Sequence, residues 1–268
     1  PFILRRVKTD PGIAPDLPPK IEQIVWCTLT REQAAWYQAA LNNMRSALQS
    51  RDARERQGAI LKVLLQLKLA CNGVASLQKD RSDIYSRSGK IERLADMLAS
   101  VVVNGEKALV FSQYPSQFEK LRALLMQRLA SELDRPVDVL TITGDDSVAA
   151  REETQRRFAE SERVSVILIS LKAGGTGLNL QSATHVFHLD RWWNAAVEDQ
   201  ATDRAWRIGQ TQTVFAYKLV CRGTLEERID ALIAKRRELA GDLLGDSNEE
   251  SVIRELMKLD GEALQGVL

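Results

Sequence analysis

Short apolar segments alternate with helical patterns through the central part of this chain. The run Val164–Ile169 is apolar almost throughout, which is typical of a strand buried on both faces. Between such runs, apolar residues recur at helical spacing, as at Ile91, Leu94 and Leu98. This alternation predicts an α/β fold: a parallel sheet with helices on both faces and right-handed crossovers. The other predicted strands lie at 108–111, 139–143, 186–189 and 214–219.

Helical patterns also flank the alternating unit. Residues 30–33 form a capping-box pattern ahead of one helix, and a second helix runs from about 52 to 71 and ends at Asn72-Gly73. Together they predict a helical hairpin, preceded by a proline-rich linker and a strand at 21–27. Capping patterns at 116–119 and 224–227 predict two further helix starts, and the segment after Gly245 has only a weak helical pattern.

Composition excludes several classes of protein. The chain has 268 residues, 44% hydrophobic residues and a formal net charge of +1, so a nucleic-acid surface would have to be a local patch. Its three cysteines are widely spaced, which indicates free thiols and neither a disulfide framework nor a zinc site. His185 and His188 lack a nearby third ligand, so we expect no metal there. No apolar run approaches the length of a membrane span.

Polar and glycine residues follow the predicted strands at the edge where parallel sheets bind ligands. Ser112 and Gln113 follow one strand, Gly144 follows another, and residues 170–177 follow Ile169. The glycines at 174, 175 and 177 would let the backbone approach a phosphate, although a structural tight turn explains the same pattern.

Arg204 and Arg207 are three residues apart, the spacing that places two side chains on one face of a helix. Gly209 is then expected to end that helix. Two fixed guanidiniums on a short helix suit a phosphate chain in which charge is shifting, since arginine stays charged and can bind two oxygens. Ordinary surface arginines on an exposed helix are the alternative interpretation.

Several motifs in order resemble those of the Swi/Snf-type helicase-like ATPases, the DNA translocases of superfamily two. Residues 109–114 (LVFSQY) are similar to motif IV, 170–180 (SLKAGGTGLNL) to motif V, and 199–210 (DQATDRAWRIGQ) to motif VI. DRWWN at 190–194 lies where the family has Asp-x-Trp-Trp-Asn. PFILRR at the start and LPPK at 17–20 resemble the beginning of the second half of the motor.

The resemblance implies the second RecA-like lobe of such a motor, with an inserted helical hairpin and a C-terminal brace helix. In the family, motif VI supplies arginine fingers to ATP bound by the other lobe, and we expect the whole protein to move along duplex DNA and remodel protein–DNA complexes. The implied division is a linker and entry strand at 1–27, a helical protrusion at 28–85, the lobe at 86–222, the brace at 223–245 and a tail at 246–268.

The resemblance also implies functional roles for individual residues of this chain, assigned motif position by motif position. Arg204 and Arg207 become the catalytic fingers, while Gln200, Asp203, Gly175 and Gly177 lie at the ATP interface. The phosphate backbone of duplex DNA would be contacted without sequence preference by seven residues: Ser112, Gln113, Arg151, Lys172, Asn179, Trp192 and Trp193.

The chain departs from the family pattern at a few positions. Trp206 replaces a frequent histidine, and Arg191 and Ala195 replace prolines. Cys71-Asn72-Gly73 occupies the place where the family usually has Cys-Asn-His-Pro. We interpret Arg191 as an added positive charge that suits a phosphate.

The sequence contains neither a Gly-Lys-Ser/Thr loop nor an Asp-Glu pair to hold magnesium. ATP and Mg²⁺ are therefore expected to be held by an N-terminal RecA-like lobe of the same protein. The chain alone is expected to be inactive, and we expect it to be part of a longer, monomeric protein.

Two alternatives remain open: the lobe of another superfamily-two DNA or RNA helicase, and a non-catalytic nucleic-acid-binding scaffold. We expect the protein to be cytoplasmic and associated with the nucleoid in a prokaryote, or nuclear in a eukaryote, and membrane association is not expected.

Overall fold

The computed structural model describes residues 16–48, 53–73, 87–174 and 177–240, and a six-stranded sheet forms its centre. The strands lie in the order β1-β6-β5-β2-β4-β3, and every pair is parallel, which confirms the predicted sheet. The strands are β1 (Lys20–Cys27), β2 (Ala108–Ser112), β3 (Asp138–Ile142), β4 (Val164–Ser170), β5 (His185–His188) and β6 (Val214–Cys221).

Successive residues of the central strands enter two different cores. In β2, Ala108 and Val110 belong to one core, and Leu109 and Phe111 belong to the other. All seven residues of β4 are buried. A strand covered on both faces needs apolar side chains at nearly every position, and for this reason these strands read as continuous apolar runs.

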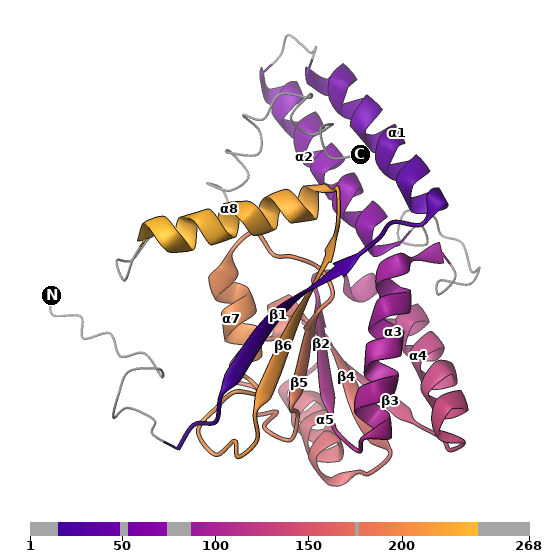
Figure 1. Ribbon diagram of the computed structural model, residues 1–268, viewed down its shortest axis with the longest axis vertical. Coiled ribbons are helices and arrows are strands. Elements are labelled where there is room, and N and C mark those ends of the chain that lie inside the picture. Colours follow the sequence, from indigo (N-terminus) through magenta and orange to yellow (C-terminus); the bar gives the residue numbers. More distant parts are fainter. Residues whose placement is uncertain (1–15, 49–52, 74–86, 175–176, 241–268) are drawn as a thin grey trace, which may run out of the picture.

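Helices cover both faces of the sheet (Figure 1). On one face, α3 (Gly89–Val103) and α4 (Phe118–Leu133) contribute to the first core, and on the other Phe158 of α5 (Val148–Glu160) and Ala201 of α7 (Ala195–Thr202) contribute to the second. The short α6 (Leu171–Gly174) follows β4 directly. No helix in the described part of the chain has both the length and the apolar composition needed to cross a membrane.

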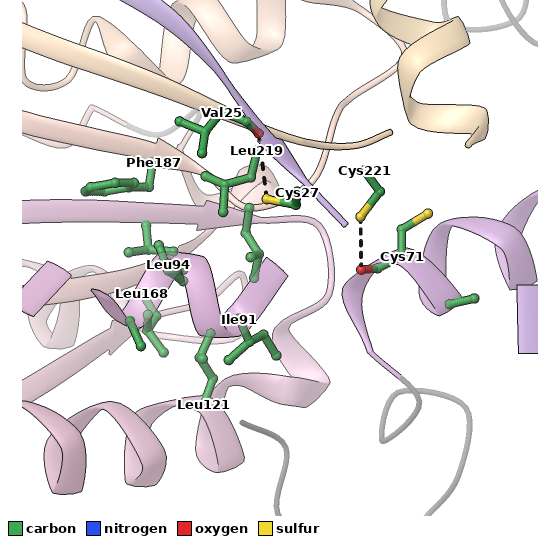
Figure 2. Close-up of a cluster of buried hydrophobic side chains, with 14 of the residues drawn as sticks. Val25, Cys27, Cys71, Ile91, Leu94, Leu121, Leu168, Phe187, Leu219 and Cys221 are labelled. Atoms are coloured by element: carbon green, nitrogen blue, oxygen red, sulfur yellow. Dashed lines mark hydrogen bonds between the residues drawn. The ribbon is translucent and has the colours of Figure 1, made fainter. Parts of the chain in front are cut away.

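The predicted hairpin is formed by α1 (Arg31–Leu48) and α2 (Ala53–Asn72), which lie side by side beyond the end of β1 (Figure 1). Tyr37 of α1 accepts a 2.7 Å hydrogen bond from the backbone N–H of Leu225, at the start of α8 (Leu225–Ala240). Figure 2 shows Cys71, at the end of α2, beside Cys221, at the end of β6. The core of the sheet therefore continues into the hairpin.

One of three predicted capping boxes is confirmed. Thr30 Oγ1 accepts from the N–H of Gln33 at 3.2 Å, and Gln33 Oε1 accepts from the N–H of Thr30 at 3.1 Å. The Ser116 cap is wrong, because a 3-10 turn, η3 (Pro115–Gln117), precedes α4, whose N-cap Gln117 makes no side-chain capping bond. At α8 the pattern is altered, since Thr224 Oγ1 accepts from the N–H of Glu226 instead.

The predicted domain borders at 85/86 and 245/246 fall in or beside segments outside the described residues, as do the start of the linker and the whole tail. Those borders stay predictions. The helical hairpin and the C-terminal helix of the predicted architecture are confirmed as elements of the fold.

Candidate functional site

Two of the predicted DNA-contacting residues lie at the carboxyl end of β2, and both are hydrogen-bonded to Asp190 beyond β5. Ser112 Oγ donates to Asp190 Oδ2 at 2.6 Å, and Gln113 donates to Oδ1 from its backbone N–H at 3.1 Å and from Nε2 at 2.7 Å. Asp190 and Ser112 are buried. Both side chains are therefore held in place by the carboxylate of Asp190, a motif residue for which the resemblance implied no role.

Helix α2 adds a lysine and an asparagine to this cluster. Asn72 Nδ2 donates to Asp190 Oδ2 at 3.2 Å. Lys68 Nζ donates to Gln113 Oε1 at 3.1 Å and to the carbonyl oxygen of Arg191 at 2.8 Å. The polar cluster thus connects the hairpin to the carboxyl edge of the sheet.

The interpretation of Arg191 as a charge available to a phosphate is wrong. Its side chain is 1% exposed and is paired with Glu198 of α7 at 3.0 Å and with Asp230 of α8. Burial acts to raise the pKa of Glu198, but Arg191 and the other nearby positive groups and the Trp192 N–H together hold that pKa below its usual value. The buried arginine, paired with the buried carboxylate of Glu198 and the half-buried carboxylate of Asp230, fixes the loop after β5 onto two helices.

Trp192 and Trp193 occupy opposite sides of that loop. Trp193 is buried in the core shared with the hairpin, whereas Trp192 is half-buried and packs against the other core. The ammonium of Lys68 lies 4.1 Å from the ring centroid of Trp193 and 5.8 Å from that of Trp192. Their role at DNA stays a prediction.

Arg204 and Arg207 do not lie on a helix, contrary to the spacing argument. Helix α7 ends at Thr202, and the N–H groups of Arg204 and Ala205 bond three residues back, Arg204 to Ala201 at 3.2 Å and Ala205 to Thr202 at 3.1 Å. We attribute the end of the helix to tertiary contacts. Thr202 Oγ1 is bonded to His188 Nε2 at 2.9 Å, and the chain beyond Thr202 contacts the neighbouring strands and loops.

Five hydrogen bonds hold these turns, at Arg204, Trp206 and Gln210. The N–H of Leu180 donates to the carbonyl of Arg204 at 3.2 Å, and Trp206 Nε1 donates to the carbonyl of Pro18 at 2.7 Å. The buried amide of Gln210 donates to three backbone carbonyls, those of Gln181, Ala183 and Ala205. The two arginines therefore project from a segment whose backbone is held by surrounding structure.

The two guanidiniums influence each other electrostatically. Partial burial lowers the pKa of Arg204, the charge of Arg207 lowers it further, and Asp203 opposes this. Arg204 is half-buried and Arg207 is exposed. A pair of like charges held close together is stabilised by an anion that binds both.

The remaining predicted residues of motifs V and VI are spread over neighbouring segments. Gln200 is exposed on α7, and Asp203 follows that helix with its N–H bonded to Asp199. Gly177 has φ +42°, a value that favours glycine. Gly175 lies outside the described residues. Lys172 is exposed on α6.

Helix α5 connects Arg151 to Asn179. The N–H of Asn179 donates to Gln155 Oε1 at 2.7 Å, and Gln155 Nε2 donates to the carbonyl of Arg151 at 3.2 Å. The guanidinium of Arg151 itself donates to the carbonyl of Gly144 at 2.8 Å. The side chain of Gln155 therefore joins the backbone of Arg151 to that of Asn179.

The two histidines and the cysteines Cys71 and Cys221 are buried inside the fold. His185 and His188 are three positions apart in β5, so their side chains point to opposite faces of the sheet. Cys71, Cys221 and Glu226 do form a buried group whose ligand atoms lie within 4.8 Å of one another. The ammonium of Lys90 occupies both oxygens of Glu226, at 2.6 and 2.8 Å, and magnesium prefers oxygen ligands. This group does not suit Mg²⁺.

The parallel sheet with helices on both faces defines a RecA-like lobe of the helicase type. A model of the helicase conserved C-terminal domain matches residues 89–209, and one of an SNF2-related domain matches residues 1–75. YwqA of Bacillus subtilis is 37% identical over 250 residues, covering 92% of this chain and 26% of YwqA.

Solved structures give the same assignment. The SWI2/SNF2 ATPase C-terminal domain of Sulfolobus solfataricus is 35% identical with a TM-score of 0.70, covering 93% of this chain and 98% of that domain. The ATPase core from that organism in complex with dsDNA is 36% identical with a TM-score of 0.75, over 99% of this chain and 54% of the core. The chain belongs to the SWI2/SNF2 family of superfamily-two ATPases, as a C-terminal lobe, and spans about a quarter of the length of its curated relatives.

Proposed function

We propose that this chain is the second motor lobe of a double-stranded-DNA-dependent ATPase and translocase, and that Arg204 and Arg207 reach ATP held by an N-terminal lobe. The proposal rests on the arginine pair. The two arginines belong to a segment that is held by a hydrogen bond from Leu180 and by the side chains of Trp206 and Gln210. Prearranged guanidiniums stabilise the charge that develops on a transferring phosphoryl group, and such fingers contribute roughly a thousandfold or more to turnover.

ATP is the substrate in this proposal, and this chain contributes only part of its site. Gln200, on α7, and Asp203, directly after it, precede the arginines, where they can orient the guanidiniums or the interface with the other lobe. The described residues offer no carboxylate cluster suited to Mg²⁺, so we assign the metal and the triphosphate loop to the N-terminal lobe. The relative YwqA is named as an ATP-dependent helicase/translocase, which supports ATP use by the whole protein.

We propose duplex DNA as the polymer on which the motor acts. The structure of the Sulfolobus solfataricus relative is described as a complex with dsDNA. Arg151, Lys172 and Asn179 lie around motif V, and contacts made to phosphates would be sensitive to salt and indifferent to sequence. Remodelling of protein–DNA complexes, a monomeric state and the nucleoid or nuclear location belong to the same proposal.

ATP turnover by the full-length protein, with and without duplex DNA, tests the assignment. Arg204→Ala and Arg207→Ala together should reduce DNA-stimulated turnover by roughly a thousandfold while ATP binding persists. Arg135→Ala is the matched control, because Arg135 is exposed on the loop before β3, at the opposite edge of the sheet. Turnover that ignores duplex DNA, or that survives the double substitution, would contradict the proposal.

Strand displacement separates the remaining helicase alternative. A translocase of the proposed kind should couple ATP turnover to movement along a duplex without releasing a single strand. ATP-driven strand release at a rate that matches turnover would place the protein among the strand-separating helicases instead.

A further inference from the structure

Lys68 is a charged residue on the apolar face of helix α2. It follows Leu64 by four positions and Leu67 by one, both of which are buried, and it is itself 1% exposed. An ammonium group at such a position loses its hydration, and this costs free energy unless the group is paired. A methionine or leucine would fill the same stripe without that cost, so the charge calls for a specific explanation.

The ammonium of Lys68 is directed at the loop that follows β5. It donates to the carbonyl of Arg191 at 2.8 Å and to Gln113 Oε1 at 3.1 Å, and it lies 4.1 Å from the ring centroid of Trp193. The amide of Gln113 in turn donates to Asp190 at 2.7 Å. Lys68 thus contacts Gln113, which follows β2, and the loop that follows β5, and the family resemblance implies DNA contacts at both places.

We propose that Lys68 is a positioning residue, which holds Gln113 and the Trp192–Trp193 loop in the arrangement that grips DNA and so connects the α1–α2 hairpin to that grip. This inference rests on the proposed function. Lys68 does not reach DNA itself, because it is enclosed by the loop that it holds.

The contacts of Lys68 are unlike those of the neighbouring buried cations. Lys90 and Arg191 each pair directly with a carboxylate, at 2.6 Å to Glu226 and at 3.0 Å to Glu198. Lys68 instead donates to a backbone carbonyl and to an amide oxygen, and lies against an indole ring. The ammonium of Lys68 therefore stabilises the conformation of the loop after β5 and forms no direct ion pair with a carboxylate of the described residues.

The surroundings of Lys68 also make its charge sensitive to pH. The pKa of Lys68 is lowered to about 8, chiefly by burial, and Lys90 of α3 acts in the same direction. Three carboxylates oppose this: Asp190 beyond β5, Glu226 of α8 and Glu198 of α7. Loss of the proton above pH 8 removes the cation–π contact and one donor, so the hold on the tryptophan loop weakens as pH rises.

The full-length protein tests the inference through three substitutions. Lys68→Met removes the charge and keeps the length, Lys68→Arg keeps a charge that does not titrate near pH 8, and Lys62→Met alters an exposed lysine of the same helix as a control. We expect Lys68→Met to raise the DNA concentration for half-maximal stimulation of ATP turnover about tenfold, the equivalent of losing a desolvated cation–π contact. Turnover without DNA and the KM for ATP should not change.

The pH profile distinguishes positioning from a general loss of stability. In the parent protein, DNA affinity should fall between pH 7 and 9, and Lys68→Arg should retain it across that range. The difference in tryptophan emission between parent and Lys68→Arg, taken over the same pH range, should titrate near pH 8, because the other tryptophans cancel.

Each result has a distinct meaning. Equal losses of basal and DNA-stimulated turnover in Lys68→Met, in proportion to its folded fraction, would overturn the inference in favour of a structural role. Unchanged DNA dependence in that variant would also overturn it. If the parent protein is not stimulated by DNA, the proposed function fails, and the emission titration still decides whether Lys68 holds the tryptophan loop.

Discussion

The ammonium of Lys90 lies 2.6 Å from Glu226 Oε1, and both side chains are fully buried. The pair joins α3, which packs on the sheet, to the first turn of α8, and Asn72 at the end of α2 accepts from the same ammonium at 3.1 Å. Burial acts to lower the pKa of Lys90, but the carboxylate of Glu226 outweighs it and raises that pKa above its usual value. The consecutive helices α2 and α3 and the distant α8 therefore meet at one ion pair.

Removing one member of this pair should be much more harmful than replacing both. We expect Glu226→Gln to lower the free energy of unfolding by about 3–5 kcal/mol, because it leaves the Lys90 ammonium buried without a compensating charge. Lys90→Met combined with Glu226→Leu should recover most of that loss. Urea denaturation of the parent protein and the two variants measures these losses, and equal losses in the single and double variants would refute the argument.

Two glycines should respond to alanine in opposite directions. A Cβ at Gly89, the first residue of α3, would lie 2.1 Å from the carbonyl oxygen of Thr28, so Gly89→Ala should cost about 1–3 kcal/mol. A Cβ at Gly58, inside α2, would meet no atom within 4 Å, so Gly58→Ala should stabilise the chain by up to about 1 kcal/mol. Thermal unfolding of both variants checks the pair. A lower stability of Gly58→Ala would contradict the expectation that a Cβ at this position has free space.

Acid should destabilise the chain through His188. Burial lowers its pKa to about 4, below the ordinary value of 6.5, while Glu198 opposes this. Between pH 6.5 and 4 the unfolded chain binds a proton that the folded chain does not, so the free energy of unfolding falls as pH falls, by roughly 3 kcal/mol in total. His188→Gln should flatten that part of the pH profile.

The carboxylate of Glu22 provides an internal comparison for that profile. Its pKa is lowered to about 2, since its ion pairs with Lys218 and Lys20 outweigh a burial effect that acts to raise it. Its contribution is present above pH 4.5 and is lost only as pH falls from 4.5 to 2. A profile in which His188→Gln changes only this lower range would assign the effect to another group.

Trp206 should anchor the arginine segment to the chain entering β1. Trp206→Phe removes the donor to the carbonyl of Pro18 and leaves that oxygen without its side-chain partner, which should cost about 1–3 kcal/mol. If the proposed finger role holds, turnover should fall as well, but much less than in the Arg204→Ala, Arg207→Ala variant. Unchanged stability and turnover in Trp206→Phe would show that Trp206 does not anchor the arginine segment.

Much of the fold could be predicted because its evidence is local. The apolar runs that become β2 and β4 are long and nearly uninterrupted, and Gln33 has both the type and the spacing of a capping-box residue. The cap expected at Ser116 failed, because the proline before it starts a 3-10 turn and shifts the beginning of α4 to Phe118.

The candidate site was harder to predict because its evidence is not local. Lys68 stood on an apolar stripe, and that was a signal in the sequence, but its partners come from positions 45 and 123 residues further along the chain. Arg191 looked available for the same reason, since Glu198 and Asp230 could be assigned to it only once α7 and α8 were placed.

The sequence by itself determined the alternation of strands and helices, the order of the motifs and hence the family, because periodicity and motif residues are read along the chain. Tertiary structure alone decided that Arg204 and Arg207 lie on turns beyond α7, that Arg191 is buried, and that Lys68 holds the tryptophan loop. These outcomes depend on which buried charges and hydrogen-bonding groups meet when the layers pack. The free-energy cost of leaving such groups unpaired overrides the local preference of any one segment.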